Sequence, residues 1–189
     1  PEMTPMLNFN TTEYIRASWY IQQQQITGYQ PNNTLYCVTQ TLEPSNRTVP
    51  FFSGKVLDVY NYGNLDRVNG QQENQKNFTL CARQTNSSYP SQILNGPCFL
   101  PNLFAGPYWV IDAGPSSNNY SWAIVSGGPP TVQYPDGNCT TSENGVNGSG
   151  LWLFTRERYG ETANLYVSHM RYLLQNMGYS YVEIFKSVA

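Results

Sequence analysis

The chain has 189 residues, which is enough for one domain with a sizeable core. Charged residues make up 12% of it and the net charge is −2, which argues against a nucleic-acid-binding protein and against a polybasic membrane anchor. Aromatic residues reach 14%, and 15 glycines and 13 prolines are spread along the chain as turns, which is typical of an all-β domain.

Cysteines and glycosylation sequons indicate an oxidising compartment. The four cysteines form no CxxC pair and the chain has one histidine, so two disulfides are favoured over a zinc site or any other metal site. No apolar run is long enough to span a bilayer, and no signal peptide is evident. We therefore expect a secreted, N-glycosylated protein without a transmembrane segment. The eight sequon asparagines are Asn10, Asn32, Asn46, Asn77, Asn86, Asn119, Asn138 and Asn147.

The first half of the chain is predicted to be strands. Residues 1–12 form an irregular extension, in which Asn10 caps a single helical turn. Alternating and β-branched segments then predict strands at 18–24, 35–43 and 54–63, a more polar strand at 65–75, and another strand at 77–84. Residues 85–106 are rich in turn formers and predict a strand interrupted by Pro97 and Pro101.

The second half contains the clearest elements. Residues 107–114 and 119–128 predict a hairpin, and 129–150 form a long, polar, glycosylated loop insertion. Residues 151–155 are the last bulky strand. Apolar residues then recur at helical spacing over 161–177, where Gly178 follows as the expected end of the helix. Residues 180–186 predict a short final strand.

The last bulky strand ends on Arg156. A buried guanidinium needs a carboxylate or the face of an aromatic ring, and Trp19 in the first strand is the best ring available. Stacking of the two would close one end of a barrel. The predicted fold is an all-β, eight-stranded antiparallel up-and-down β-barrel with one C-terminal α-helix packed outside and a short final strand.

These segments resemble the lipocalins of the calycin superfamily. ASWY at 17–20, YWVID followed by YSWAIV, and LWLFTR at 151–156 are similar to the family's first-strand, hairpin and last-strand motifs, although Ala17 replaces the usual glycine. The stretch FLPNLFAGPYWVID looks closest to the apolipoprotein D-like branch. The resemblance covers about residues 11–187. It implies that residues 1–189 form a single lipocalin domain and that Arg156 packs on Trp19.

An eight-stranded barrel encloses room for one small ligand. Strand alternation, taken with the aromatic excess, predicts an apolar cavity for a flat hydrophobic molecule such as a retinoid, carotenoid, bilin, sterol or fatty acid, with no cofactor required. The alternative is that the same aromatic side chains fill a collapsed core. The predicted ligand-binding residues are Tyr36, Val38, Phe104, Trp109, Ile111, Trp122 and Ile124.

Two other functions stay open. The barrel could be an extracellular glycoprotein scaffold or a subunit of a larger assembly that contacts other extracellular proteins through its loops. It could also be a lipocalin-type isomerase or epoxide-acting enzyme using Asp58 or Asp112. A non-enzyme is favoured, because Asp112 precedes turn residues and the one histidine, His169, lies on a helix flank.

Four cysteines allow three pairings. The preferred one joins Cys37 to Cys139, which would tie the insertion to the barrel, and Cys81 to Cys98, which would staple a local loop.

Overall fold

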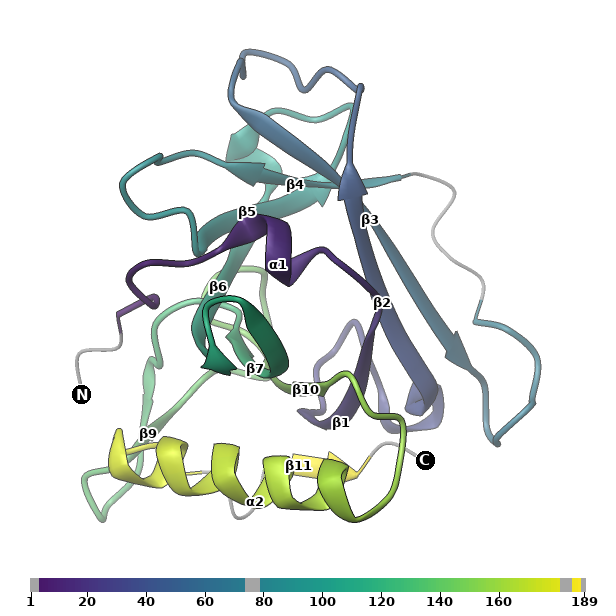
Figure 1. The fold of residues 1–189 in the computed structure, drawn as a ribbon, viewed down its shortest axis with the longest axis vertical. Coiled ribbons are helices and arrows are strands. Elements are labelled where there is room, and N and C mark those ends of the chain that lie inside the picture. The colour runs from purple at the N-terminus through teal and green to yellow at the C-terminus, as the bar shows by residue number, and fades with distance from the viewer. Residues whose placement is uncertain (1–3, 74–78, 181–184, 188–189) are drawn as a thin grey trace.

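A computed structural model describes residues 4–73, 79–180 and 185–187, and most of its elements are strands (Figure 1). The helices are α1 (Thr11–Tyr14), η1 (Asn32–Thr34), η2 (Asn102–Phe104) and α2 (Glu161–Asn176). The strands are β1 (Trp19–Gln25), β2 (Tyr36–Pro44), β3 (Lys55–Asn64), β4 (Leu80–Gln84), β5 (Gln92–Pro97), β6 (Gly106–Ser116), β7 (Asn119–Ser126), β8 (Val132–Gln133), β9 (Cys139–Thr140), β10 (Leu151–Thr155) and β11 (Phe185–Ser187).

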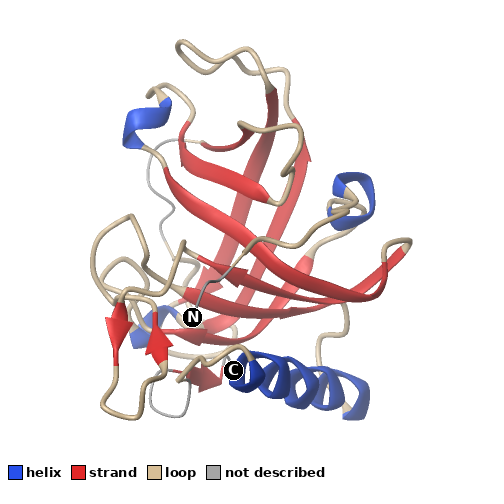
Figure 2. Cartoon of the chain, turned by 90° about the vertical axis from the view of Figure 1, so that its left-hand side faces the viewer, coloured by secondary structure: helices blue, strands red, loops and turns tan. Residues whose placement is uncertain are grey.

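Eight antiparallel strands close into a barrel, as the sequence predicts. Each of β1 to β6 pairs with the next strand along the chain, β7 pairs with β10, and β10 pairs with β1. The closing pair aligns Tyr20 with Thr155 and Gln24 with Trp152, across a bulge between Ile21 and Gln23. The last strand, β11, adds to the outer edge of β1. The strands cross the molecule obliquely, as closure of a barrel requires (Figure 2).

One barrel strand differs from the prediction. The described part of 65–75 forms turns instead of a polar strand, because Asp66 and Asn69 adopt positive φ angles of 63° and 57°. Gly70 N–H also donates to the Arg67 carbonyl at 3.0 Å, which folds the segment on itself. Its place in the barrel is taken by β5, which pairs with β4 and β6 and ends at Pro97, where a missing N–H is tolerated.

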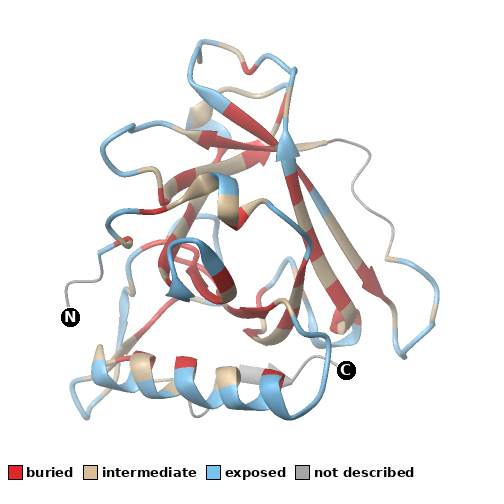
Figure 3. Ribbon diagram, in the orientation of Figure 1, coloured by how far each residue is buried: buried red, intermediate tan, exposed pale blue. Residues whose placement is uncertain are grey.

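Two apolar layers lie on opposite faces of the barrel wall. The inner layer includes Trp19, Tyr108, Val110, Val125 and Phe154. The outer layer joins β6, β7 and β10 to the buried side of α2, and Figure 3 shows the opposite side of that helix exposed. The outer residues are Ile111, Trp122, Ile124, Leu151, Leu153, Met170, Leu174 and Tyr179.

The helical ends follow the sequence closely. Asn10 Oδ1 accepts a 3.1 Å hydrogen bond from Glu13 N–H, which is the predicted cap of α1. Gly178 follows α2 with φ of 82°, and Tyr179 N–H donates to the Leu174 carbonyl at 2.9 Å.

The loop insertion at 129–150 is held by hydrogen bonds. Cys139 N–H donates to the Gly178 carbonyl at 3.0 Å, and the Gln25 and Thr141 side chains bond each other at 2.6 Å. The predicted Cys81–Cys98 disulfide is present. The predicted Cys37–Cys139 bridge is wrong in this structure, where both cysteines carry free thiols and backbone and amide contacts attach the insertion instead.

Candidate functional site

One end of the barrel is closed by a cation on an aromatic ring. The Arg156 guanidinium lies 3.4 Å from the centroid of the fully buried Trp19 ring, which is the predicted arrangement. Its donors reach the carbonyls of Tyr14 at 2.9 Å and Glu13 at 3.0 Å, and a further bond goes to Ala17. Trp19 Nε1 donates to the same Tyr14 carbonyl at 3.0 Å, so α1 is tied beneath both side chains.

Burial governs ionisation at this end. Burial, followed by repulsion from Arg16, lowers the pKa of Arg156 to about 10. Burial likewise raises the pKa of Tyr14 and Tyr108, so both phenols stay neutral and act as hydrogen-bond groups. No described carboxylate forms a salt bridge with Arg156, whose charge is balanced by backbone carbonyls.

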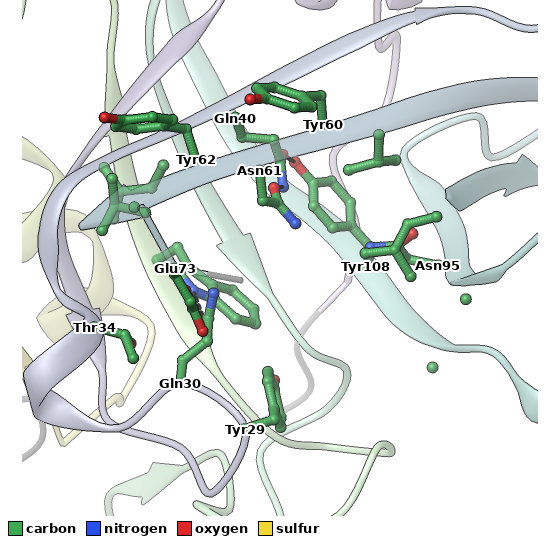
Figure 4. A pocket seen from close by; sticks show the side chains of 18 of the residues that line it. Tyr29, Gln30, Thr34, Gln40, Tyr60, Asn61, Tyr62, Glu73, Asn95 and Tyr108 are labelled. Atoms are coloured by element: carbon green, nitrogen blue, oxygen red, sulfur yellow. Dashed lines mark hydrogen bonds between the residues drawn. The ribbon is translucent and has the colours of Figure 1, made fainter. Parts of the chain in front are cut away.

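Above the closed end lies a cavity of about 560 Å³, within the range of small-molecule sites. Its wall is mainly apolar and also carries amides and phenols (Figure 4). The apolar side chains that line it include Ile21, Val38, Leu80, Phe104, Trp152 and Phe154. The polar ones include Gln30, Gln40, Asn61, Asn95 and Tyr108.

The cavity reaches solvent at the other end of the barrel, where the loops 26–35, 98–105 and 127–150 and the described residues 65–73 lie. Tyr29, Phe104 and Val146 line the cavity there and are 41%, 57% and 63% exposed. Glu73 also lines it, at the end of β3 beside Gly63. A ligand could therefore enter between these loops.

Two of the seven predicted ligand-binding residues line the cavity, namely Val38 and Phe104. The inward placement of Ile111, Trp122 and Ile124 is wrong, because these side chains lie in the outer layer with α2. Trp109 is half-buried and packs on the same layer, and Tyr36 is absent from the cavity wall.

The reasons are local. Tyr36 precedes a register shift in β2, where Cys37 has φ of 54°, and such a bulge reverses the alternation. On β6 and β7 the position of α2 determines which side chains face outward. The bulky apolar side chains pack against α2, and smaller ones such as Val110, Ala123 and Val125 point into the barrel.

Sequence analysis missed the polar wall. Gln40 and Asn61 are directly paired across β2 and β3, and Tyr108 and Asn95 come from the neighbouring strands β6 and β5. Gln40, Asn61 and Asn95 each lie two residues after an apolar residue of the inner layer, namely Val38, Val59 and Ile93, and this shared face was a usable signal.

The proposed acidic pair does not assemble. Asp58 Oδ1 accepts from Ser45 Oγ at 2.6 Å and lies 3.3 Å from Arg47 Nε, so its carboxylate is engaged by the β2–β3 loop. Asp112 does not line the cavity, and burial raises its pKa while Ala113 N–H donates to it at 2.9 Å. His169 is exposed on α2, and its ring centroid lies 5.1 Å from that of Trp122 in an edge-to-face arrangement.

The sequons lie on several surfaces. Asn32, Asn46, Asn86, Asn119 and Asn147 are exposed, and Asn77 lies outside the described residues. Asn10 and Asn138 are half-buried, and their amide groups donate to Ser117 and Asp136 at 2.9 Å. Among the described residues, the helices are too short or too polar to cross a membrane.

Comparison with known proteins shows the fold. No protein-family model matches the chain, and no curated protein sequence matches it. Apocrustacyanin C2 is 15% identical with a TM-score of 0.57, and lobster apocrustacyanin A1 is 16% identical with a TM-score of 0.58. Each alignment covers 95% of this chain and 79% of that protein.

H1 crustacyanin from the lobster Homarus americanus is 14% identical over 100% of this chain and 88% of that one, with a TM-score of 0.54. Crustacyanins are lipocalins, so the chain has the fold that its sequence motifs imply. The placement in the apolipoprotein D-like branch stays a prediction.

Proposed function

We propose that this protein is a secreted, N-glycosylated lipocalin that binds a small hydrophobic molecule in its barrel and carries it outside the cell. The observation that carries the proposal is the 560 Å³ cavity, which lies above the closed end formed by Trp19 and Arg156 and reaches solvent at the other end. Apolar side chains such as Leu80, Trp152 and Phe154 would bury the ligand.

The lipocalin resemblance and the crustacyanin-like fold favour a carrier over an enzyme. The described carboxylates Asp58 and Asp112 do not face each other across the cavity, which removes the strongest reason to expect acid–base chemistry. Burial is then the mechanism: affinity comes from apolar area removed from water, less the cost of ordering the mouth loops.

Filling the cavity tests the proposal. Val38→Trp introduces an indole into the space, and Val132→Trp makes the same change at a site that is 39% exposed and outside the cavity wall. Titration with retinol, followed by the fluorescence of the native tryptophans, should show binding to the wild type and to Val132→Trp. Val38→Trp should bind at least tenfold more weakly while keeping a cooperative melting transition. Equal retinol affinity in all three proteins would contradict a ligand in the barrel.

A scaffold is the second candidate, because the loop after β5 presents apolar side chains outward. Leu103 is 86% exposed and Phe99 is 62% exposed. Exposed apolar groups of this size can mark a protein contact. If the loop joins subunits, Leu103→Asp should convert an assembly of the wild-type protein to monomers in sedimentation, and a wild type that is monomeric at all concentrations would exclude this role.

A further inference from the structure

Four asparagines of this chain are followed directly by glycine. They are Asn69, Asn95, Asn144 and Asn147. In such a pair the backbone nitrogen of the glycine can attack the side-chain carboxamide of the asparagine, because glycine has no Cβ to hinder the approach. The attack requires the peptide between the two residues to rotate toward the side chain. Whether each pair reacts in the folded protein therefore depends on how firmly its glycine is held.

Three of the four glycines are held in place by the backbone around them. Gly70 N–H donates to the Arg67 carbonyl at 3.0 Å. Gly148 N–H donates to the Gly127 carbonyl at 2.8 Å. Gly96 lies within β5, which is paired with β4 on one side and with β6 on the other. Each of these peptides must leave its hydrogen-bonded position before the nitrogen can reach the side chain.

Gly145 is not held in this way. Both Asn144 and Gly145 are exposed, and Gly145 N–H donates to no described residue. A Cβ added to Gly145 would meet no atom within 4 Å, whereas a Cβ added to Gly70 would collide with the Leu65 carbonyl. Asn144 is also outside the sequons, because Val146 stands where a serine or threonine is required, so no glycan covers its carboxamide. This pair alone among the four has an exposed asparagine and an unengaged glycine nitrogen.

The Asn144–Gly145 pair lies between two attachments of the loop insertion to the cavity mouth. On one side, the Glu143 carbonyl accepts from Gly28 N–H at 2.9 Å, which joins the insertion to the loop between β1 and β2. On the other side, Val146 lines the cavity and its carbonyl lies against the start of β6. A change in backbone length between these two points must shift one of them.

We propose that Asn144 is a site of spontaneous deamidation, and that its isoaspartate form loosens the attachment of the loop insertion at the cavity mouth. The Gly145 nitrogen bonds to Asn144 Cγ, and Nδ2 leaves as ammonia with the proton of the Gly145 amide. Water then opens the resulting succinimide. Opening at the side-chain carbonyl gives aspartate, and opening at the backbone carbonyl gives isoaspartate, which adds one carbon to the main chain. The reaction requires no ligand, enzyme or oxidant, so it is independent of the carrier function.

Mass spectrometry of the purified protein, incubated at pH 8, tests the site. Peptides are mapped by fragmentation without enzymatic removal of glycans, because that step itself converts a glycosylated asparagine to aspartate. In the folded protein Asn144 should gain one dalton about tenfold faster than Asn69, where the hydrogen bond of Gly70 must break first. In guanidinium chloride the two asparagines should react at similar rates. Equal rates in the folded protein, or an undiminished preference for Asn144 in the denatured one, would overturn the proposal.

Hydrogen exchange tests the consequence at the cavity mouth. The isoaspartate form, separated by chromatography, should exchange the Gly28 amide hydrogen faster than untreated protein, because the Glu143 carbonyl that accepts it has moved. Freshly prepared Asn144→Asp carries the same new charge on an unaltered backbone and should keep the slower exchange. Asn144→Gln should form no product during the same incubation. Unchanged Gly28 exchange in the isoaspartate form, or equally fast exchange in Asn144→Asp, would overturn the role of the added backbone carbon.

Discussion

The closed end and the cavity of the barrel contain similar residue types, but these residues are packed in one and line open space in the other. At the closed end Trp19, Arg156 and Tyr14 are packed or buried, and the donors of Arg156 and Trp19 find backbone carbonyls. In the cavity, Trp152 is half-buried and lines open space. Packed and hydrogen-bonded groups stabilise a fold, whereas side chains around an open space leave surface for a ligand. Stability should therefore depend on the closed end and affinity on the cavity.

A matched pair of tryptophan substitutions gives the largest expected contrast. Trp19→Ala should lower the free energy of unfolding by about 3–5 kcal/mol, because it removes a fully buried indole and the surface on which Arg156 lies. Trp152→Ala should destabilise less, since its ring is half-buried, and should weaken retinol binding. Urea denaturation and fluorescence titration measure both. A larger stability loss for Trp152→Ala than for Trp19→Ala would contradict the division of roles between the closed end and the cavity.

Removing the disulfide at the loop after β5 tests whether this part of the cavity mouth needs a covalent constraint. The Cys81–Cys98 disulfide spans a sequence separation of 17 residues. Replacing both cysteines by alanine should cost about 3 kcal/mol by freeing the unfolded chain. Chemical denaturation under non-reducing conditions measures the loss, and an unchanged midpoint would show that packing alone holds this loop.

The outer layer should affect stability without affecting the ligand. Ile124→Val removes one methylene group between β7 and α2 and should cost about 1 kcal/mol. Its retinol affinity should equal that of the wild type, because Ile124 faces away from the cavity. A change in retinol affinity without a change in stability would indicate that Ile124 faces the cavity, as strand alternation predicted.

The smallest expected effect concerns acid. Burial raises the pKa of Glu13, but hydrogen bonds from Arg16 and from Tyr120 N–H, together with the positive charges of Arg16 and Arg156, lower it overall below its usual value of 4.5. A depressed carboxyl pKa contributes stability that is fully present above about 4.5 and is lost as pH falls through the folded-state value. Glu13→Gln should therefore flatten the dependence of stability on pH between about 5 and 3. If the pH dependence of stability in Glu13→Gln equals that of the wild type, Glu13 does not contribute to the acid sensitivity of the closed end.

The sequence predicted the frame of the molecule well. Amphipathic spacing located α2 to within one residue, and the pairing of Trp19 with Arg156 followed from the cost of burying a lone guanidinium. These features depend on local patterns or on a single strong requirement, and both can be read from residue types.

The cavity wall was harder to predict, because whether a strand side chain points inward or outward depends on partners that are distant in sequence. Trp122 and Ile124 alternate correctly, but only the position of α2 shows which face is outside. In β2, the bulge at Cys37 changes the parity of Tyr36 relative to Val38.

The most direct measurement is an absorbance spectrum of the protein purified from its natural source, followed by organic extraction and mass spectrometry. A carrier should release one apolar compound in a stoichiometric amount. A protein that is empty as isolated, and that also fails to bind apolar probes such as retinol, would contradict a ligand-binding barrel.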